Sequence, residues 1–177
     1  MKIGIYGGTF NPIHRGHLTA ARAALDALGL DRLLLIPASV PPHKALPQGS
    51  ADAADRLEMA ALACAELGPQ AQALDTELHR TGPSYTVDTL RQLRMEHPED
   101  ELWLLMGTDM FLSLERWYHA SDILSLAHIG AFDRAHPQPG EDLAAQKMAA
   151  VDQKNQQLEK DMADLKEKLA ALMAAKA

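Results

Sequence analysis

Short apolar runs alternate with longer mixed stretches along the first three quarters of the chain. The short runs predict strands, because glycine, proline or polar residues bound them. The longer stretches predict helices, two of which end at Gly29 and at Gly68-Pro69. The predicted strands are Lys2–Tyr6, Leu33–Ile36, Ala71–Asp75, Leu102–Met106 and His128–Phe132, and the predicted helices are Leu18–Leu28, a segment from Asp52 or Asp55 to Leu67, Tyr85–Glu96 and Ile123–Leu126.

This alternation predicts an α/β fold, a Rossmann-like parallel sheet with helices on both faces. Ligands bind such sheets at the carboxyl ends of the strands. Three segments directly follow predicted strands: the Gly7-Gly8 turn, the loop Pro41–Gly49 and Gly107-Thr108-Asp109. We therefore expect these segments to converge at one edge of the sheet.

The composition changes after Pro139-Gly140, beyond which there is no glycine, proline or aromatic residue. This part predicts one long helix. Its apolar positions recur every seven residues, which is typical of a coiled-coil seam. One seam position holds Val151, Leu158, Leu165 and Leu172, and the complementary position holds Met148, Asn155, Met162 and Leu169.

A buried Asn155 at an a position favours a parallel dimer in register. We therefore predict two domains, residues 1–138 and a helical tail at 141–177, with a homodimer formed through the tail. The alternative is a single amphipathic helix that docks on its own domain.

Composition and charge narrow the class of protein. The 177 residues are enough for one domain with a core and an appendage. A net charge of −7 argues against a nucleic-acid partner, although a local basic site can still bind phosphates. The single cysteine, Cys64, fits a small buried side chain and a reducing compartment. Because we find no signal-peptide pattern and no membrane-length apolar run, we predict a cytoplasmic protein without a membrane partner.

Two histidines, His14 and His17, stand at the mouth of a predicted helix, just after the glycine turn. A glycine turn between a strand and a helix presents backbone N–H groups to an anion. The two imidazoles can share one face of the helix start and donate to phosphate oxygens, while Gly16 keeps that approach open. The alternatives are two surface histidines or a metal site, which would need a third ligand that is not adjacent.

The stretch Gly-Gly-Thr-Phe-Asn-Pro-Ile-His-Arg-Gly-His at residues 7–17 resembles the signature of the nucleotidyltransferase superfamily. Members transfer a nucleotidyl group from a nucleoside triphosphate to a phosphate or similar acceptor and release pyrophosphate. Three further segments, Val40–Lys44, Gly82–Leu90 and Gly107–Leu124, are similar to bacterial nicotinate-nucleotide adenylyltransferase. The resemblance runs from Lys2 to about Pro137.

The resemblance implies adenylyl transfer from ATP to nicotinate mononucleotide, giving deamido-NAD and pyrophosphate, with Mg²⁺ carried by the ATP. It implies His14 and His17 as catalytic residues and no metal-ligating residues. For each residue implied to contact substrate, the alternative is a purely structural role: Thr86 as the start of a helix, for example, or Trp117 as an aromatic residue at the edge of the core. The implied contacts are Gly7, Gly8, Thr9 and Phe10 at the turn, Lys44 on phosphates, Thr86 and Tyr118 near the nicotinate, Trp117 stacked on its ring, Asp109 near the ribose and Arg134 near the adenine.

The chain departs from the family after Arg134. The family continues into a Ser/Thr-rich segment with an arginine that holds the ATP phosphates, whereas this chain continues into the heptad tail. The resemblance therefore predicts an incomplete triphosphate site and impaired activity. Two alternatives stay open: an adenylyltransferase for pantetheine phosphate or nicotinamide mononucleotide, and a non-catalytic nucleotide-binding assembly protein that dimerises through its tail.

Overall fold

The computed structural model describes residues 1–42, 45–133, 160–164 and 166–167. By its contacts the chain divides into two compact units, Met1–Arg134 and Ala135–Ala177. The described residues of the second unit are helical. The rest of the predicted heptad helix lies outside the described residues, as do Lys44 and Arg134.

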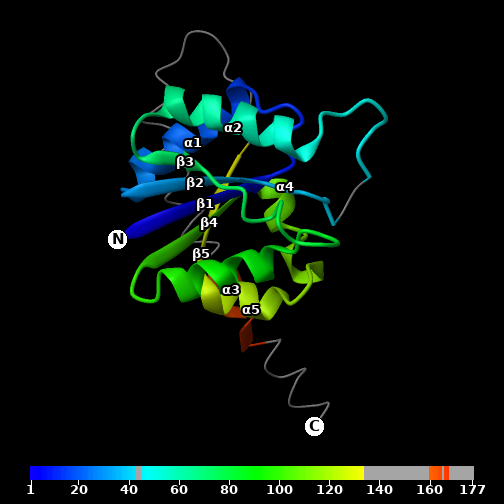
Figure 1. The fold of residues 1–177 in the computed structure, drawn as a ribbon. Coiled ribbons are helices and arrows are strands. Elements are labelled where there is room, and N and C mark those ends of the chain that lie inside the picture. Colours follow the sequence, from blue (N-terminus) through cyan, green and yellow to red (C-terminus); the bar gives the residue numbers. More distant parts are fainter. Residues whose placement is uncertain (43–44, 134–159, 165, 168–177) are drawn as a thin grey trace. The chain divides into compact units, whose positions relative to one another are not determined.

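The first unit is an α/β fold built on a five-stranded parallel sheet in the order β3-β2-β1-β4-β5 (Figure 1). Every strand and helix predicted for this part of the chain is present. Two elements were not predicted, the helix α4 and the 3₁₀ helix η1, because each is too short to show a periodic pattern. The elements are β1 Lys2–Gly8, α1 Arg15–Leu28, β2 Arg32–Pro37, α2 Ala53–Leu67, β3 Ala71–Ala73, α3 Thr86–Glu96, β4 Glu101–Gly107, α4 Thr108–Phe111, η1 Leu114–Arg116, α5 Ala120–Leu126 and β5 His128–Phe132.

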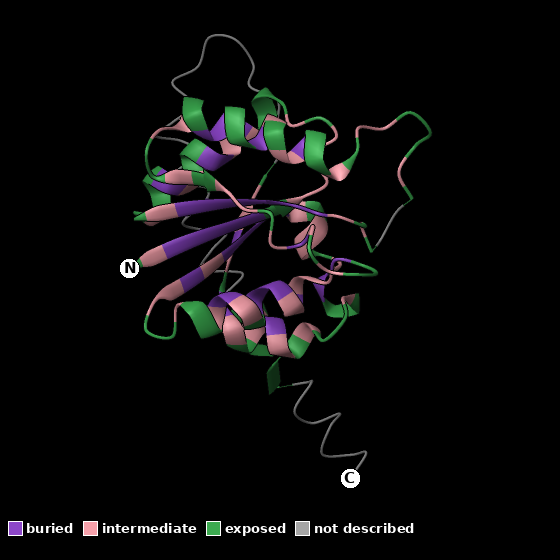
Figure 2. Ribbon diagram, viewed as in Figure 1, coloured by how far each residue is buried: buried purple, intermediate pink, exposed green. Residues whose placement is uncertain are grey.

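Helices cover both faces of the sheet, with α1 and α2 on one side and α3 and α5 on the other (Figure 1). Successive strand residues point to opposite faces, so each strand supplies two cores. In β2, Leu33 and Leu35 pack in the core that contains α1 and α2, whereas Leu34 and Ile36 pack in the core that contains α3 and α5. The central strands are buried along most of their length (Figure 2). This double burial explains why the strands are continuous apolar runs.

Cys64 lies on α2 in the first of these cores, as predicted, and burial raises the pKa of its thiol to about 11. In the part of the chain that the structure describes, no helix is both long and apolar enough to cross a lipid bilayer.

The strand order places a switch point between β1 and β4. From β1 the chain first moves outward through β2 to β3, and it then returns to pair β4 on the other side of β1. Loops diverge at such a point, and the crevice between them is where open α/β sheets bind ligands.

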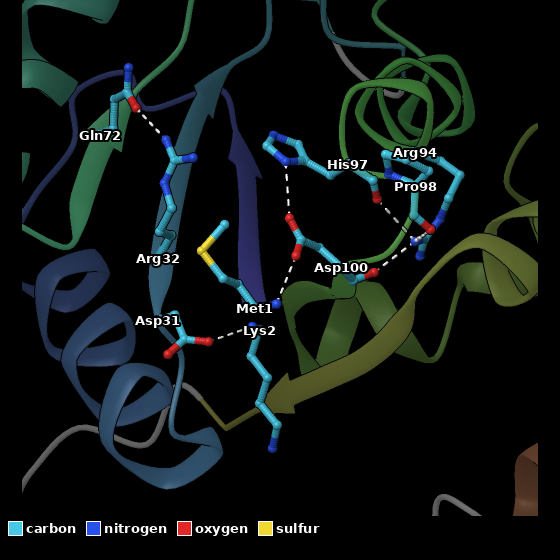
Figure 3. A network of polar contacts seen from close by, with 9 residues as sticks. All are labelled: Met1, Lys2, Asp31, Arg32, Gln72, Arg94, His97, Pro98 and Asp100. Carbon is cyan, nitrogen blue, oxygen red and sulfur yellow. Dashed lines mark hydrogen bonds and ion pairs between the residues drawn. The ribbon is translucent and has the colours of Figure 1, made fainter.

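A network of polar contacts lies at the amino-terminal ends of the strands, opposite the ends that face the switch-point crevice (Figure 3). The amino group of Met1 lies 2.7 Å from the Asp100 carboxylate, which also contacts His97 Nδ1 at 3.1 Å. Hydrogen bonding to the amino group holds the pKa of Asp100 below its usual range. The Arg94 guanidinium donates to the carbonyls of Asp100 and Leu126, at 2.7 and 2.9 Å.

Candidate active site

A cavity of about 620 Å³ opens where β1, β2 and β4 end. This volume suits a small-molecule ligand. Gly7 and Gly8 line it at the end of β1, which runs two residues further than predicted, Pro41 and Pro42 line it after β2, and Gly107 lines it at the end of β4. The three segments that we expected to converge therefore do so.

Most of the predicted site residues that the structure describes lie around this cavity. Asp109 is exposed in the first turn of α4, and neither it nor Tyr118 is among the lining residues. The predicted residues that line the cavity are Gly7, Gly8, Thr9, Phe10, His14, His17, Thr86 and Trp117.

The two histidines cap α1 with their own side chains. His14 is the N-cap residue, and its Nδ1 accepts a hydrogen bond from the Gly16 N–H at 3.2 Å. In return, His17 Nδ1 accepts from the His14 N–H at 3.1 Å. The helix therefore begins at Arg15, three residues before the predicted start. The prediction missed this start because serine, threonine, aspartate and asparagine are the usual caps.

This reciprocal cap decides where each imidazole carries its proton. A ring nitrogen that accepts a hydrogen bond from a backbone N–H has no proton of its own. The neutral rings of His14 and His17 therefore carry their proton on Nε2. Since both rings line the cavity, with their centroids 3.9 Å apart, the geometry makes two neighbouring Nε2–H donors for an anion.

Phe10 packs against His17, and the position of its ring requires a glycine at position 8. Its ring meets that of His17 edge-on, with the centroids 5.2 Å apart, and it is 2% exposed. Phe10 has a φ of 47°, in the left-handed region that non-glycine residues rarely adopt. A Cβ at Gly8 would lie 2.9 Å from the Phe10 ring, so glycine at position 8 makes room for it.

Arg56 was missed by the sequence analysis and lies directly behind the site. It is 1% exposed, and Nη1 donates to the carbonyls of Thr9 and Ala38, both at 2.7 Å. Nη2 donates to Ser39 O at 3.2 Å. Burial lowers the pKa of Arg56, while the nearby Asp52 charge opposes this shift. One guanidinium thus joins the loop after β1 to the loop after β2.

A second buried polar group lies on the other side of the loop after β2. Ser84 Oγ accepts from the N–H groups of Ser39 and Val40, at 3.0 and 3.3 Å. The Ser84 hydroxyl is hydrogen-bonded in turn to Glu77, which also accepts from Thr89 Oγ1 at 2.7 Å. Burial raises the pKa of Glu77, and these hydroxyl hydrogen bonds oppose that effect.

Trp117 and Thr86 line the cavity from different segments of the chain. Two tyrosines next to them in sequence, Tyr118 and Tyr85, connect these segments. The Tyr118 ring lies on the Tyr85 ring, with centroids 4.4 Å apart and planes 30° apart. Tyr85 directly precedes Thr86, and Tyr118 directly follows Trp117. The stack thus connects the segment that carries Thr86 to the segment that carries Trp117.

Comparison with known proteins confirms the resemblance found in the sequence. The cytidylyltransferase-like family model matches residues 5–164. The chain is 45% identical over 144 residues to a protein of Shewanella baltica named as a probable nicotinate-nucleotide adenylyltransferase, covering 77% of this chain and 65% of the relative. It is 44% identical over 154 residues to the protein of that name in Geobacter metallireducens, covering 85% of this chain and 68% of the relative.

The fold also matches solved structures. The structure of Plasmodium falciparum nicotinic acid mononucleotide adenylyltransferase complexed with NaAD aligns with a TM-score of 0.62 at 16% identity, covering 82% of this chain and 70% of that chain. At this identity the match concerns the fold. In sequence, the chain spans 59% to 65% of the length of the first curated relatives it matches, which come from Gloeobacter violaceus and Shewanella baltica.

Proposed function

Because the chain belongs to the cytidylyltransferase-like family and is related within it to nicotinate-nucleotide adenylyltransferases, we propose that it transfers the adenylyl group of ATP to nicotinate mononucleotide. A phosphate oxygen of the mononucleotide attacks the α-phosphorus of ATP and forms a new P–O bond. The bond from the α-phosphorus to the bridging oxygen breaks, and pyrophosphate leaves with the electron pair. The products are deamido-NAD and pyrophosphate.

The observation that carries this proposal is the paired cap of α1. The backbone of the helix start holds both His14 and His17 with Nε2–H as the donor side. Phosphoryl-type transfer depends on positioning and on stabilising charge over several oxygens. The two imidazoles at the start of α1 can stabilise this charge, because their Nε2–H groups are already oriented before the charge develops.

The loop after β1 supplies the second part of the proposed site. The Thr9 carbonyl is bound by Arg56, and the Phe10 N–H belongs to the same planar trans peptide and points the opposite way. We place the acceptor phosphate near the backbone N–H groups of Gly8, Thr9 and Phe10, with Lys44 as a further phosphate contact. Asp109 near the ribose and Arg134 near the adenine remain predictions from the family resemblance.

We place the acceptor base between Thr86 and Trp117. Both line the cavity, and the stack of Tyr85 on Tyr118 links the segments that carry them. A flat aromatic side chain suits a pyridine ring, with a cation–π component when the ring nitrogen is quaternary.

We place Mg²⁺ on the ATP phosphates. Among the residues that the structure describes, there is no group of three or more histidine, cysteine or carboxylate side chains able to hold a metal ion. The ion neutralises phosphate charge when ATP binds. His14 and His17 then act on phosphate oxygens alone.

The experiment is pyrophosphate release with MgATP and three acceptors offered separately: nicotinate mononucleotide, nicotinamide mononucleotide and pantetheine phosphate. Release with nicotinate mononucleotide, and deamido-NAD as the product, supports the proposal. Preference for either other acceptor supports the first alternative. Calorimetric binding of ATP without turnover of any acceptor supports the assembly protein and contradicts the enzyme.

We also propose that the heptad tail at 141–177 forms a parallel dimer, as a part distinct from the domain at 1–138. The support is the seven-residue spacing of its apolar positions. A cytoplasmic location likewise stays a prediction.

A further inference from the structure

We propose that Arg56 is a positioning residue, which holds the loop after β1 and the loop after β2 in one fixed arrangement at the candidate site. The proposal rests on the proposed function for its effect on turnover. It goes beyond that function by assigning a role to a side chain on α2 that is not among the residues lining the cavity.

Arg56 and Ser84 bind the same stretch of backbone, Ala38–Val40. Arg56 donates to the carbonyls of Ala38 and Ser39, while Ser84 Oγ accepts from the N–H groups of Ser39 and Val40. The Ala38 carbonyl and the Ser39 N–H belong to one peptide group, and the Ser39 carbonyl and the Val40 N–H belong to the next. Because a trans peptide points these two atoms in opposite directions, Arg56 and Ser84 hold the same two peptides from opposite sides.

Arg56 also binds the loop after β1. The same Nη1 atom that binds the Ala38 carbonyl also binds the Thr9 carbonyl, at 2.7 Å in each case. In addition, the Ala38 N–H donates to Gly8 O at 2.9 Å. The orientation of the Thr9–Phe10 peptide, and thus of its N–H, is therefore coupled to the conformation of Ala38–Val40.

Burying the Arg56 guanidinium has an energetic cost. A buried cation is unfavourable unless it is well hydrogen-bonded, and the Arg56 guanidinium donates to neutral backbone carbonyls, those of Ala51, Thr9, Ala38 and Ser39. A purely apolar side chain would fill the space on α2 without that cost. The fork of a guanidinium, however, reaches several carbonyls from one rigid group, which a lysine ammonium does with less geometric control.

Arg94 offers a matched control in the same chain. It also donates to backbone carbonyls, those of His97, Pro98 and Asp100, which Figure 3 shows, and that of Leu126. These carbonyls lie near the amino-terminal ends of the strands, away from the cavity. Replacing either arginine removes a similar set of hydrogen bonds. Only Arg56 acts on loops that line the cavity.

The test compares Arg56→Lys with Arg94→Lys, with Ser84→Ala as a milder change on the other side of the same peptides. Amide hydrogen exchange at Ala38, Ser39 and Val40 is followed by NMR. kcat and KM are measured at a temperature where circular dichroism shows each variant fully folded. We expect Arg56→Lys to lose protection at these amides and to lose about 10-fold to 100-fold in kcat/KM, the size of effect that small misplacements produce.

Ser84→Ala is expected to change both readouts in the same direction by less, while Arg94→Lys lowers the melting temperature and leaves both unchanged. Unchanged exchange in Arg56→Lys, or an equal loss of activity in Arg94→Lys, overturns the proposal. If the unaltered chain turns over no acceptor, the proposed function fails on its own account. The exchange at Ala38, Ser39 and Val40 then decides the role of Arg56.

Discussion

His17 Nδ1 accepts the backbone N–H of His14, and His14 Nδ1 accepts the N–H of Gly16. One pair of side chains thus starts the helix and presents two Nε2–H donors. A mutation at either histidine therefore has two consequences, one for helix stability and one for the charge that a ligand meets.

We predict that His17→Ala lowers kcat by on the order of 10²- to 10³-fold, the typical cost of losing one donor to developing charge. It should also destabilise the fold by about 1 kcal/mol, because α1 loses half of its reciprocal cap. Pyrophosphate release and urea unfolding measure the two effects.

His17→Gln serves as the control for the cap, since glutamine at the third helical position can accept the same N–H. This variant should recover the stability and only part of the activity. Turnover that is unchanged in His17→Ala would remove His17 from the catalytic machinery.

Trp117→Ala should weaken binding of nicotinate mononucleotide more than binding of ATP. Stacking on an aromatic side chain is worth roughly 1–3 kcal/mol per base in nucleic-acid sites, and a pyridine ring should be comparable. The matched control is Trp103→Ala, because Trp103 is also half-buried but is not among the cavity-lining residues. Calorimetry that shows equal weakening of both ligands in Trp117→Ala would indicate a structural tryptophan.

The sequence predicted the part of this molecule that depends on local patterns. The strands were visible as apolar runs, and the cavity residues near Gly8 and Thr86 lay in recognisable motifs. Arg56 was not predictable in this way, because its role depends on contacts with residues that are distant in sequence, Thr9 at 47 positions and Ala38 at 18 positions. Nor was the stack of Tyr85 on Tyr118, which forms between segments that are distant in sequence.

Glu77→Gln should stabilise the protein at neutral pH relative to the unaltered chain. Burial raises the pKa of Glu77 in the folded state, so the folded protein holds this proton more tightly than the unfolded chain does. Stability from this group is therefore present at low pH and is lost as the pH rises above the ordinary value of 4.5. Urea midpoints measured from pH 4 to pH 7 should show a gap between the two proteins that widens with pH. A constant gap would contradict a raised folded-state pKa for Glu77.

Asp100→Asn should show the opposite dependence. The pKa of Asp100 is held below its ordinary value of 3.8 by the Met1 amino group, so this carboxylate contributes stability above that pH. The contribution is lost as the pH falls through the lowered folded-state pKa. We expect Asp100→Asn to be less stable than the unaltered protein at pH 6, with the difference shrinking toward pH 3. A variant as stable as its parent at pH 6 would show that the ion pair in Figure 3 contributes nothing measurable.

In the tail, Leu165 lies on the seam of the heptad pattern. If the tail forms a parallel dimer, a charge at this position must be buried against its copy, which costs far more than a charge on the outer face. Leu165→Glu should therefore convert a dimer into a monomer in sedimentation velocity at micromolar concentration. Gln157→Glu, which adds the same charge off the seam, should leave the dimer intact.

Asn155 tests the orientation of the same dimer. An asparagine at an a position restricts coiled coils to two parallel strands at some cost in stability. Asn155→Leu should therefore strengthen association and permit assemblies larger than a dimer, which sedimentation resolves by mass. Attractive pairs such as Lys154 with Glu159 of the other copy are each worth roughly 0.2–1 kcal/mol, so they select the orientation and do not drive assembly. If the unaltered chain is a monomer and Leu165→Glu changes only its melting temperature, the tail is a single helix docked on its own domain.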